Sequence, residues 1–476
     1  MVNQWHHGNQ STVSAWVRLT FLTSIFLTST FLTSKALLLA LICTFIGLMT
    51  LKGIQINGSS YFPLDPEAER VLVIANRNSP VSLRVAQYYQ QRRRIPTANF
   101  VTLDLPDSSL TPALESISYS TYQTQVEQPL RNFLTRNGLT DRIRYIVLTR
   151  GIPLRVKEVP YQLKSGETQT QHQSVDSTLA ALDYRVSAIE FRDIEDQKLT
   201  KKEIFGLLTP NLYWRQTYPF EHHLTGGYLV TRLDGYSERE ARALVDRALT
   251  PRPSLRGTVL IDPIGNYEHS NDPQLIDIYD PQSCKPQVIP LSCIPQPKAM
   301  IESTGKDMNN DLRLSLSLIQ KSFTTLQMAL APPNTFTTGD NLMAYASWGS
   351  NDESFRPENY RKLKFIPGAI AETFVSTSAR GFFPTSTGQS MIGDLMAAQG
   401  GVTGIRGYVE EPEFQGMGSP TILFNRYFGG ANLATAYYQS IRYVGWRDVV
   451  LGDPLAMAIV KPRAANSDQK NLTNDQ

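Results

Sequence analysis

The stretch VLVIA at residues 71–75 is a short continuous run of apolar residues. A strand of a parallel sheet that is covered by helices on both faces has this composition. A strand with one solvent-exposed face would instead alternate apolar and polar residues. Ser79 and Pro80 follow the run, and Pro96 comes shortly afterwards. Serine is a favoured N-cap, proline is tolerated in the first helical turn, and a later proline ends a helix. The sequence therefore predicts a strand at 71–75 and a helix that ends near residue 94.

Strand-like and helix-like segments alternate along most of the chain. Ser237 and Glu240 form a capping box, which predicts a helix from there to residue 249. Strands are expected at 101–105, 143–149, 227–232, 257–262, 342–346 and 369–375, and helices at 126–138, 391–398 and twice within 421–445; segments 402–408 and 448–455 complete the pattern. A further helical face is expected to include Leu318, Ile319, Phe323, Leu326 and Leu330. The pattern predicts an α/β fold with a mostly parallel sheet flanked by helices.

Residues 157–225 interrupt this alternation, because they are polar and irregular, and we expect an insertion or a long connection there. We predict three parts: a cytoplasmic tail with a membrane anchor or signal segment at 1–60, the α/β region with irregular insertions at 61–463, and a disordered tail at 464–476. The α/β region could divide into subdomains at 61–262 and 301–463, joined by a loop at 263–300 that is rich in proline and carries two cysteines.

Residues 36–51, ALLLALICTFIGLMTL, are uncharged and almost wholly apolar, with Lys35 and Lys52 at the two ends. The segment is short for a span of roughly 20 residues, although a lysine at each end can extend its usable length. No small-x-small cleavage site follows it, which favours an uncleaved signal anchor over a removed signal peptide. Arg18 and Lys35 precede the segment and place the amino terminus in the cytoplasm. We expect a membrane-anchored protein whose bulk is extracytoplasmic, in the periplasm or at the cell surface.

Charge and cysteine content limit the other partners. The net charge of +3 over 476 residues gives no electrostatic argument for nucleic-acid binding. Cys43 lies in the apolar segment, whereas Cys284 and Cys293 flank a loop rich in proline and could pair in an oxidising compartment, although spacing alone does not establish the bond. A zinc site is less favoured because His269 has no partner at ligand-like spacing. We predict no metal and no other cofactor.

Two segments run from a strand-like stretch into a turn of small polar residues: YASWGSND at 345–352 and ETFVSTSARGF at 372–382. Catalytic groups in α/β enzymes lie on such turns. A carboxylate there could activate Ser347, Ser376 or Ser378 as a general base. The candidates are Ser347, Asp352, Glu372 and Ser378 for catalysis, and Trp348, Asn351 and Arg380 for binding. The competing interpretation is that the serines and Asn351 cap turns with their side chains.

The order of several motifs resembles the gingipain-type cysteine peptidases, which have a caspase-like α/β fold. The motifs are YIVLTRGIP at 145–153, YLVTRL at 228–233 with the helix after it, and LGDPL at 451–455. The resemblance covers roughly residues 70–456. The chain is also similar to a family of exported bacterial proteins with the same SWGSND and GDPL signatures.

In the gingipain-type family, a Tyr-x-Gly-His-Gly turn carries the general base and a later Cys-x-x-Gly turn carries the nucleophile. By position the histidine falls on Trp348 and the cysteine on Ser378. An indole nitrogen is a donor only, and a serine hydroxyl needs an adjacent base, so the thiol–imidazole mechanism is not expected. The leading hypothesis is a binding domain without catalysis that holds a peptide, an envelope component or a partner in the cleft. The alternative is a hydrolase with a serine and an acidic residue, and a third is a purely structural scaffold without a ligand-sized cleft.

Overall fold

The computed structural model describes residues 65–162, 166–184, 189–190, 207–265, 305–332 and 335–460. These residues all belong to one compact unit, Leu64–Gln476. The apolar segment at 36–51, the cysteines at 43, 284 and 293, and the predicted tail at 464–476 lie outside the described ranges. Within those ranges, every helix is too short or too polar to span a bilayer.

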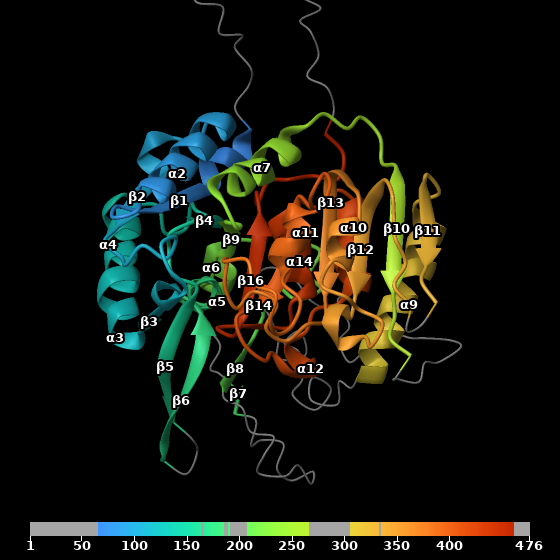
Figure 1. Ribbon diagram of the computed structural model, residues 1–476. Coiled ribbons are helices and arrows are strands. Elements are labelled where there is room, and N and C mark those ends of the chain that lie inside the picture. Colours follow the sequence, from blue (N-terminus) through green and yellow to red (C-terminus); the bar gives the residue numbers. More distant parts are fainter. Residues whose placement is uncertain are drawn as a thin grey trace, which may run out of the picture. The chain divides into compact units, whose positions relative to one another are not determined.

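A ten-stranded sheet forms the centre of the unit (Figure 1). Its strands follow the order β11 (Leu326–Leu330), β10 (Gly257–Asp262), β12 (Leu342–Ser347), β13 (Phe365–Thr373), β14 (Gly404–Tyr408), β16 (Asp448–Gly452), β9 (Leu229–Leu233), β4 (Tyr145–Thr149), β1 (Val71–Asn76) and β2 (Phe100–Leu103). Neighbours from β11 to β14 are parallel, and so are those from β9 to β2. The pairing of β14 with β16 is antiparallel. The predicted mostly parallel α/β sheet is confirmed.

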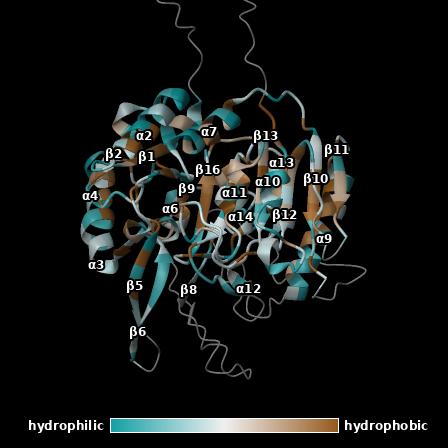
Figure 2. Cartoon of the chain, in the orientation of Figure 1, coloured by the Kyte–Doolittle hydropathy of each residue, from teal (hydrophilic) through white to brown (hydrophobic). Residues whose placement is uncertain are grey.

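The central strands are buried along their whole length, as the apolar run at 71–75 predicts. Every residue of β1, β4, β9, β12, β14 and β16 is buried. Figure 2 shows hydrophobic residues concentrated in these strands, with hydrophilic ones on the surrounding helices and loops. A strand that packs on both faces has no position at which a polar side chain reaches water, so continuous apolar runs mark the centre of the sheet.

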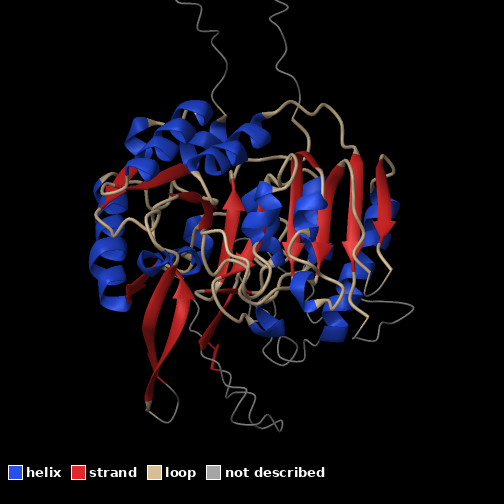
Figure 3. Ribbon diagram, in the orientation of Figure 1, coloured by secondary structure: helices blue, strands red, loops and turns tan. Residues whose placement is uncertain are grey.

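Helices cover both faces of the sheet (Figure 3). They are η1 (Pro66–Arg70), α2 (Pro80–Arg93), η2 (Thr97–Asn99), η3 (Pro112–Glu115), α3 (Tyr119–Tyr122), η4 (Gln123–Glu127), α4 (Gln128–Arg136), α5 (Val175–Ala180), α6 (His222–Thr225), α7 (Glu238–Leu249), α9 (Gly305–Ser322), η9 (Gly349–Asn351), α10 (Asn359–Lys362), α11 (Ile392–Ala397), α12 (Glu413–Gly416), α13 (Pro420–Phe428) and α14 (Leu433–Ser440). The Ser79 side chain caps α2 by accepting from the Ser82 N–H, and Ser237 and Glu240 form the expected capping box of α7. These predicted helix starts are confirmed.

The prediction that one helical face continues to Leu330 is wrong for Leu326 and Leu330. Helix α9 ends at Ser322, and Leu326–Leu330 is instead the edge strand β11. Its residues pair in parallel with Gly257–Ile261 of β10. Backbone pairing with β10 decides the conformation, and nothing within the segment itself signals that a partner strand is present.

The segment at 157–225 is more regular than expected. Strands β5 (Arg155–Gln162) and β6 (Thr168–Ser174) form an antiparallel hairpin beside β3 (Ser116–Ser118). A second small sheet joins β15 (Tyr443–Val444), β8 (Leu207–Pro210) and β7 (Ile189–Glu190). The strands of the hairpin are rich in polar residues, so they lack the apolar pattern by which a strand is recognised in a sequence.

Strands on both sides of the loop at 263–300 belong to the same sheet. Strand β10 ends at Asp262, before that loop, and pairs with β11 and β12, which come after it. Residues 61–262 and 301–463 therefore contribute adjoining strands to one sheet.

A buried arginine connects three elements of the amino-terminal half. Arg232 of β9 is fully buried, and its guanidinium binds Asp176 of α5 with an N–O distance of 2.6 Å. The same group donates to the carbonyl oxygens of Ile152, at 2.7 Å, and Pro153, at 3.0 Å, in the turn after β4. The Asp234 Oδ2 lies 3.6 Å from the same guanidinium, so two buried carboxylates compensate the charge of Arg232.

We predict that Asp176→Asn lowers the free energy of unfolding by about 3–5 kcal/mol, because it removes the closer of the two carboxylates that compensate the buried Arg232 charge and leaves only Asp234, at 3.6 Å. The control is Asp104→Asn, which removes an exposed ion pair with Arg77 and should change stability by less than about 1 kcal/mol. Urea unfolding followed by far-UV circular dichroism measures both variants. Equal effects of the two substitutions would contradict the structural role of the buried pair.

Candidate functional site

The two turns singled out in the sequence lie side by side at the carboxyl ends of neighbouring strands. Strands β12 and β13 are parallel, with Ala346 opposite Glu372 and Ser347 opposite Thr373. Just beyond them, the Phe374 N–H donates to the Ser347 carbonyl at 2.9 Å. The predicted juxtaposition of the turns is confirmed, because adjacent parallel strands end at the same edge of a sheet.

A side-chain amide joins the two turns directly. Asn351, in the turn after β12, donates from Nδ2 to the carbonyl oxygen of Phe374, after β13, at 2.7 Å. Its Oδ1 accepts from Gln389 Nε2 at 3.2 Å, and the Gln389 Oε1 in turn accepts from the Thr377 N–H at 3.1 Å. These bonds join the two turns and hold them in a fixed arrangement.

A cavity of about 450 Å³ opens beside these turns, and it includes the predicted binding residues Trp348 and Asn351. Its lining consists of Ile264, Trp348, Asn351, Ser376, Glu411, Glu413, Phe414 and Met417. These residues follow the carboxyl ends of β10, β12, β13 and β14. In a parallel sheet this edge is the usual position of a ligand site.

Trp348 forms a rigid apolar wall of the cavity. Only 2% of the residue is exposed, and its Nε1 donates to the Asn309 Oδ1 at 3.2 Å. The ring meets Phe374 and Phe414 edge to face, with centroid distances of 5.2 and 6.3 Å. Trp348 occupies the position at which the resemblance places a histidine. Its indole N–H donates to Asn309, and its ring lines the cavity.

The hydroxyls of the two serines among the catalytic candidates both accept from backbone N–H groups. Ser378 is fully buried, and its Oγ accepts from the Tyr408 N–H at 3.3 Å. Ser347 is also fully buried, and its Oγ accepts from the Gly349 N–H at 3.2 Å. Neither residue lines the cavity. The Ser347 hydroxyl carries out the local turn bonding that the competing interpretation expects, whereas the Ser378 hydroxyl bonds the backbone of β14.

Glu372 belongs to a buried ion-pair network. Arg406 of β14 binds the Glu372 carboxylate at 2.7 Å and the Asp448 carboxylate of β16 at 3.3 Å. Burial raises the pKa of Glu372, and the Arg406 guanidinium opposes that rise. The charge of Arg406 thereby joins β13, β14 and β16.

Glu372 and Ser378 lie on opposite faces of the sheet. The ideal Cβ of Gly407 would be 2.9 Å from the Ser378 Oγ, so Gly407 faces Ser378. Arg406 is its neighbour along the strand and therefore points to the other face, where it binds Glu372. Among the described residues no hydrogen bond joins any two of the four catalytic candidates. Their catalytic roles stay predictions, and this geometry does not pair Glu372 with Ser378.

Asp352 lies near a second carboxylate. Its Oδ1 accepts from the Ser354 N–H at 2.7 Å. Burial, followed by the charge of Asp352, raises the pKa of Asp262 to about 7, although Tyr345 donates to the Asp262 Oδ2 at 3.2 Å. Two carboxylates thus lie near each other at the ends of β10 and β12, and neither belongs to the cavity lining.

Arg380 closes the loop that follows the second turn. Its guanidinium donates to the carbonyl oxygens of Thr377 at 3.2 Å, Gln389 at 2.7 Å and Thr387 at 2.8 Å. Burial lowers its pKa. The structure places this predicted binding residue among backbone carbonyls, and it is not part of the cavity lining.

Two glutamates form an acidic side of the cavity that the sequence patterns did not predict. Glu411 and Glu413 come from the segment after β14, a third turn at the same edge of the sheet. Glu413 has the left-handed φ of 57°, which is uncommon for a residue with a side chain. Burial and then the neighbouring charge of Glu411 raise the pKa of Glu413 to about 7. The acidic run EEPE at 410–413 was the available signal, but its position depends on the order of strands in the sheet.

Ser376 is the hydroxyl that reaches the cavity. It is one of the three serines that a carboxylate could activate, although it is not among the four catalytic candidates. Of the residues that the structure describes around the cavity, none is a cysteine or a histidine. No group of three or more metal-ligand side chains in the described part of the chain is arranged to hold a metal ion.

Comparison with known proteins finds structural neighbours only. No protein-family model matches the chain, and no curated protein matches it. The chain is similar to the crystal structure of the Arg-specific cysteine proteinase gingipain R (RgpB), with 10% identity and a TM-score of 0.39, over 83% of this chain and 80% of that one. It is equally similar to a complex of Porphyromonas gingivalis RgpB pro- and mature domains, with 10% identity and a TM-score of 0.39, over 82% and 79% of the chains. A third structure, described as a protease, has 12% identity and a TM-score of 0.35 over 82% and 78%.

A gingipain is thus among the structural neighbours, as the motif resemblance implies, at low identity. The α/β class with its large, mostly parallel sheet is shown by the strands themselves. What the cavity binds has to be argued from its own residues.

We predict that Gly349→Ala destabilises the turn beside Trp348. Gly349 has a φ of +50°, and a Cβ there would lie 2.2 Å from the Tyr360 Oη and 2.7 Å from the Ser390 Oγ. The matched control is Gly138→Ala, with a φ of +61° and no atom within 4 Å of the added Cβ. Both variants carry the backbone strain, so Gly349→Ala should lose about 1–3 kcal/mol more. Denaturant unfolding measures the difference, and equal losses would show that the turn is not tightly packed.

Proposed function

We propose that the protein is a membrane-anchored extracytoplasmic binding protein, and that its cavity at the carboxyl edge of the sheet receives a basic side chain of a peptide or polypeptide. The supporting observation is the combination of two carboxylates with aromatic walls in one ligand-sized cavity: Glu411 and Glu413 beside Trp348 and Phe414. Carboxylates and aromatic faces both attract a guanidinium or an ammonium group.

The carboxylates of Glu411 and Glu413 form no ion pair with another described residue. Glu410, one position earlier, is different, because its Oε1 lies 2.6 Å from the His172 Nδ1. Arg447 lowers the pKa of Glu413, but its guanidinium stacks on the Trp446 ring at 4.3 Å and donates to the Glu411 backbone carbonyl. The cavity therefore keeps negative charge that a ligand cation can neutralise.

The dimensions fit a single side chain with its flanking backbone. A volume of about 450 Å³ falls within the range of ligand pockets, roughly 300–1,000 Å³. Trp348, Phe414 and Met417 supply the apolar surface that the methylene stem of arginine or lysine would contact. Asn351 supplies an amide at the rim.

Cysteine-peptidase chemistry is not part of the proposal. In the resemblance, the histidine falls on Trp348 and the cysteine on Ser378, and Ser378 does not line the cavity. The anchoring and the extracytoplasmic location rest on the apolar segment at 36–51. The expected ligand is accordingly a polypeptide or an envelope component outside the cytoplasm.

The experiment is calorimetric titration of the protein with acetyl-arginine amide. We expect binding that strengthens about tenfold from about pH 6 to about pH 8, because Glu413 has a pKa of about 7 and only its ionised form attracts the cation. Glu413→Gln should remove this pH dependence and weaken binding by about tenfold or more at the higher pH.

Acetyl-citrulline amide is the matched ligand control, because it has the shape of arginine without the charge. It should bind about tenfold more weakly than acetyl-arginine amide or not measurably. Equal affinity for the two amides, or an affinity for the arginine amide that is unchanged in Glu413→Gln, would contradict the proposed cation site.

A second candidate function is hydrolysis at Ser376. Its hydroxyl and Glu413 line the same cavity, and a carboxylate with a pKa of about 7 suits a general base near neutral pH. The proton would move from the Ser376 Oγ to the Glu413 carboxylate as the oxygen attacks an ester or peptide carbonyl, whose π electrons move to its own oxygen. The leaving alcohol or amine would then depart with the proton from Glu413, and water, deprotonated by Glu413, would release the acyl group from Ser376.

We predict for this candidate that hydrolysis of an arginine ester is lost in Ser376→Ala. Ser378→Ala is the matched control and should keep the activity, because the Ser378 Oγ accepts from the Tyr408 N–H and does not line the cavity. Absence of hydrolysis in the unmodified protein, with the arginine amide still bound, would leave binding as the function and eliminate the hydrolase.

A further inference from the structure

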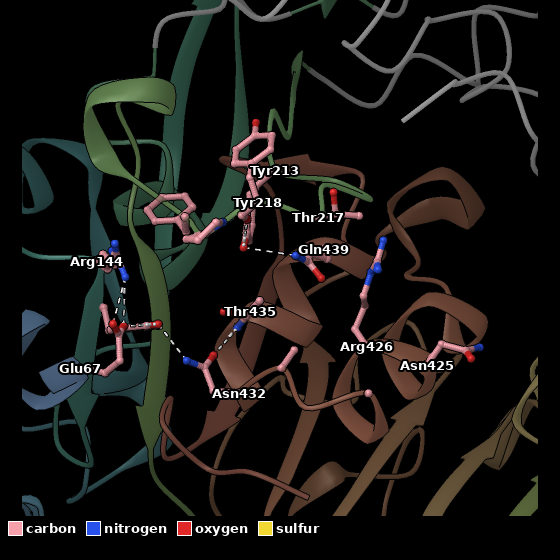
Figure 4. Close-up of a pocket in the computed structure, with 15 residues that line it drawn as sticks. Glu67, Arg144, Tyr213, Thr217, Tyr218, Asn425, Arg426, Asn432, Thr435 and Gln439 are labelled. Atoms are coloured by element: carbon pink, nitrogen blue, oxygen red, sulfur yellow. Dashed lines mark hydrogen bonds and ion pairs between the residues drawn. The ribbon is translucent and has the colours of Figure 1, made fainter. Parts of the chain in front are cut away.

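A second cavity of about 450 Å³ is lined by residues other than those of the turns described above (Figure 4). It forms where the connection at 213–220 packs against α13, α14 and the first residue of β4. Figure 4 shows Glu67 and Arg144 on one side of it and Arg426 on the other, with Gln439 between them. None of its lining residues belongs to the first cavity.

The wall formed by the connection is fixed in place. Asn211 donates from Nδ2 to the carbonyl oxygens of Tyr438, at 2.7 Å, and Ile441, at 2.8 Å, at the end of α14. The Arg215 N–H donates to the Gln439 carbonyl at 2.8 Å. These bonds attach the connection to α14, so the cavity is preformed.

Arg426 brings a positive charge that no carboxylate of the described chain compensates. Its one hydrogen bond there runs from NH2 to the Arg215 carbonyl oxygen at 3.2 Å. Burial and the nearby Arg215 charge lower the pKa of Arg426. Arg144, on the other side, is already paired with Glu67 at 3.0 Å and with Glu221. The uncompensated charge therefore favours an anion next to Arg426.

Gln439 presents a polar atom without a partner. The residue is only 3% exposed, and its Nε2 donates to the Tyr213 Oη at 3.2 Å, while the buried Oε1 has no hydrogen-bond partner among the described residues. A buried acceptor without a donor is costly, and a ligand hydroxyl would satisfy it.

Aromatic rings form the remaining surface. Tyr213 meets Tyr218 and Phe220 edge to face, with centroid distances of 6.0 and 5.1 Å, and all three line the cavity. Amides and hydroxyls of Asn425, Asn432, Thr217 and Thr435 accompany them. Aromatic surface combined with many hydrogen-bonding groups suits a ring that carries several hydroxyls.

We propose that this second cavity binds an acidic sugar, whose carboxylate pairs with Arg426, whose hydroxyls bond Gln439 and the neighbouring amides, and whose ring packs on Tyr213, Tyr218 and Phe220. A hexuronic acid is the simplest molecule with these three features. The inference does not depend on the proposed function of the first cavity.

The test is calorimetric titration of the protein with glucuronate, glucose and benzoate. Glucuronate should bind with a stoichiometry of one, whereas glucose lacks the charge and benzoate lacks the hydroxyls, so each should bind about tenfold more weakly or not at all. Equal binding of benzoate and glucuronate would overturn the assignment of a sugar. Equal binding of glucose would overturn the role of the charge.

Variants locate the site. Arg426→Gln should weaken glucuronate binding about tenfold or more, and Arg426→Lys should retain part of it. The matched control is Arg136→Gln, because Arg136 also lies in the last turn of a helix, α4, but on the exposed surface. Far-UV circular dichroism checks that each variant is folded. Unchanged glucuronate affinity in folded Arg426→Gln, or no binding to the unmodified protein, would overturn the proposal.

Discussion

The site depends on the parallel pairing of β12 with β13. This register places Ser347 opposite Thr373, so the chain leaves both strands at the same level of the sheet, and the Phe374 N–H bonds the Ser347 carbonyl at 2.9 Å. A slip by one residue would turn every side chain of the strand to the other face. It would move Glu372 away from Arg406 and remove the contact of Trp348 with Phe374.

The buried charges explain why the carboxylates at this edge of the sheet divide into two groups. Glu372 is neutralised by Arg406 on one face of the sheet, and its carboxylate contributes to holding three strands together. Glu411 and Glu413 lie beyond the carboxyl end of β14 and keep their charge available to the cavity. A carboxylate with a fixed internal cation stabilises the fold, whereas one beside an aromatic cavity can bind a ligand.

The sequence predicts what local patterns determine. The apolar run at 71–75, the Ser79 cap and the capping box at Ser237 each gave the right element, because their signals lie within a few residues. Strand β11 was missed because only its partner β10 distinguishes it from a helical face. The two turns of the site could be placed together, but Glu413 could not, because strand order brings β14 beside β13 and that order is not visible in the chain.

The most direct measurement is a crystal structure of the protein with bound acetyl-arginine amide. We expect the guanidinium within hydrogen-bond distance of Glu411 or Glu413, between the Trp348 ring and Phe414. A structure in which the turns after β12 and β13 lie apart, or in which the guanidinium binds away from these carboxylates, would contradict it.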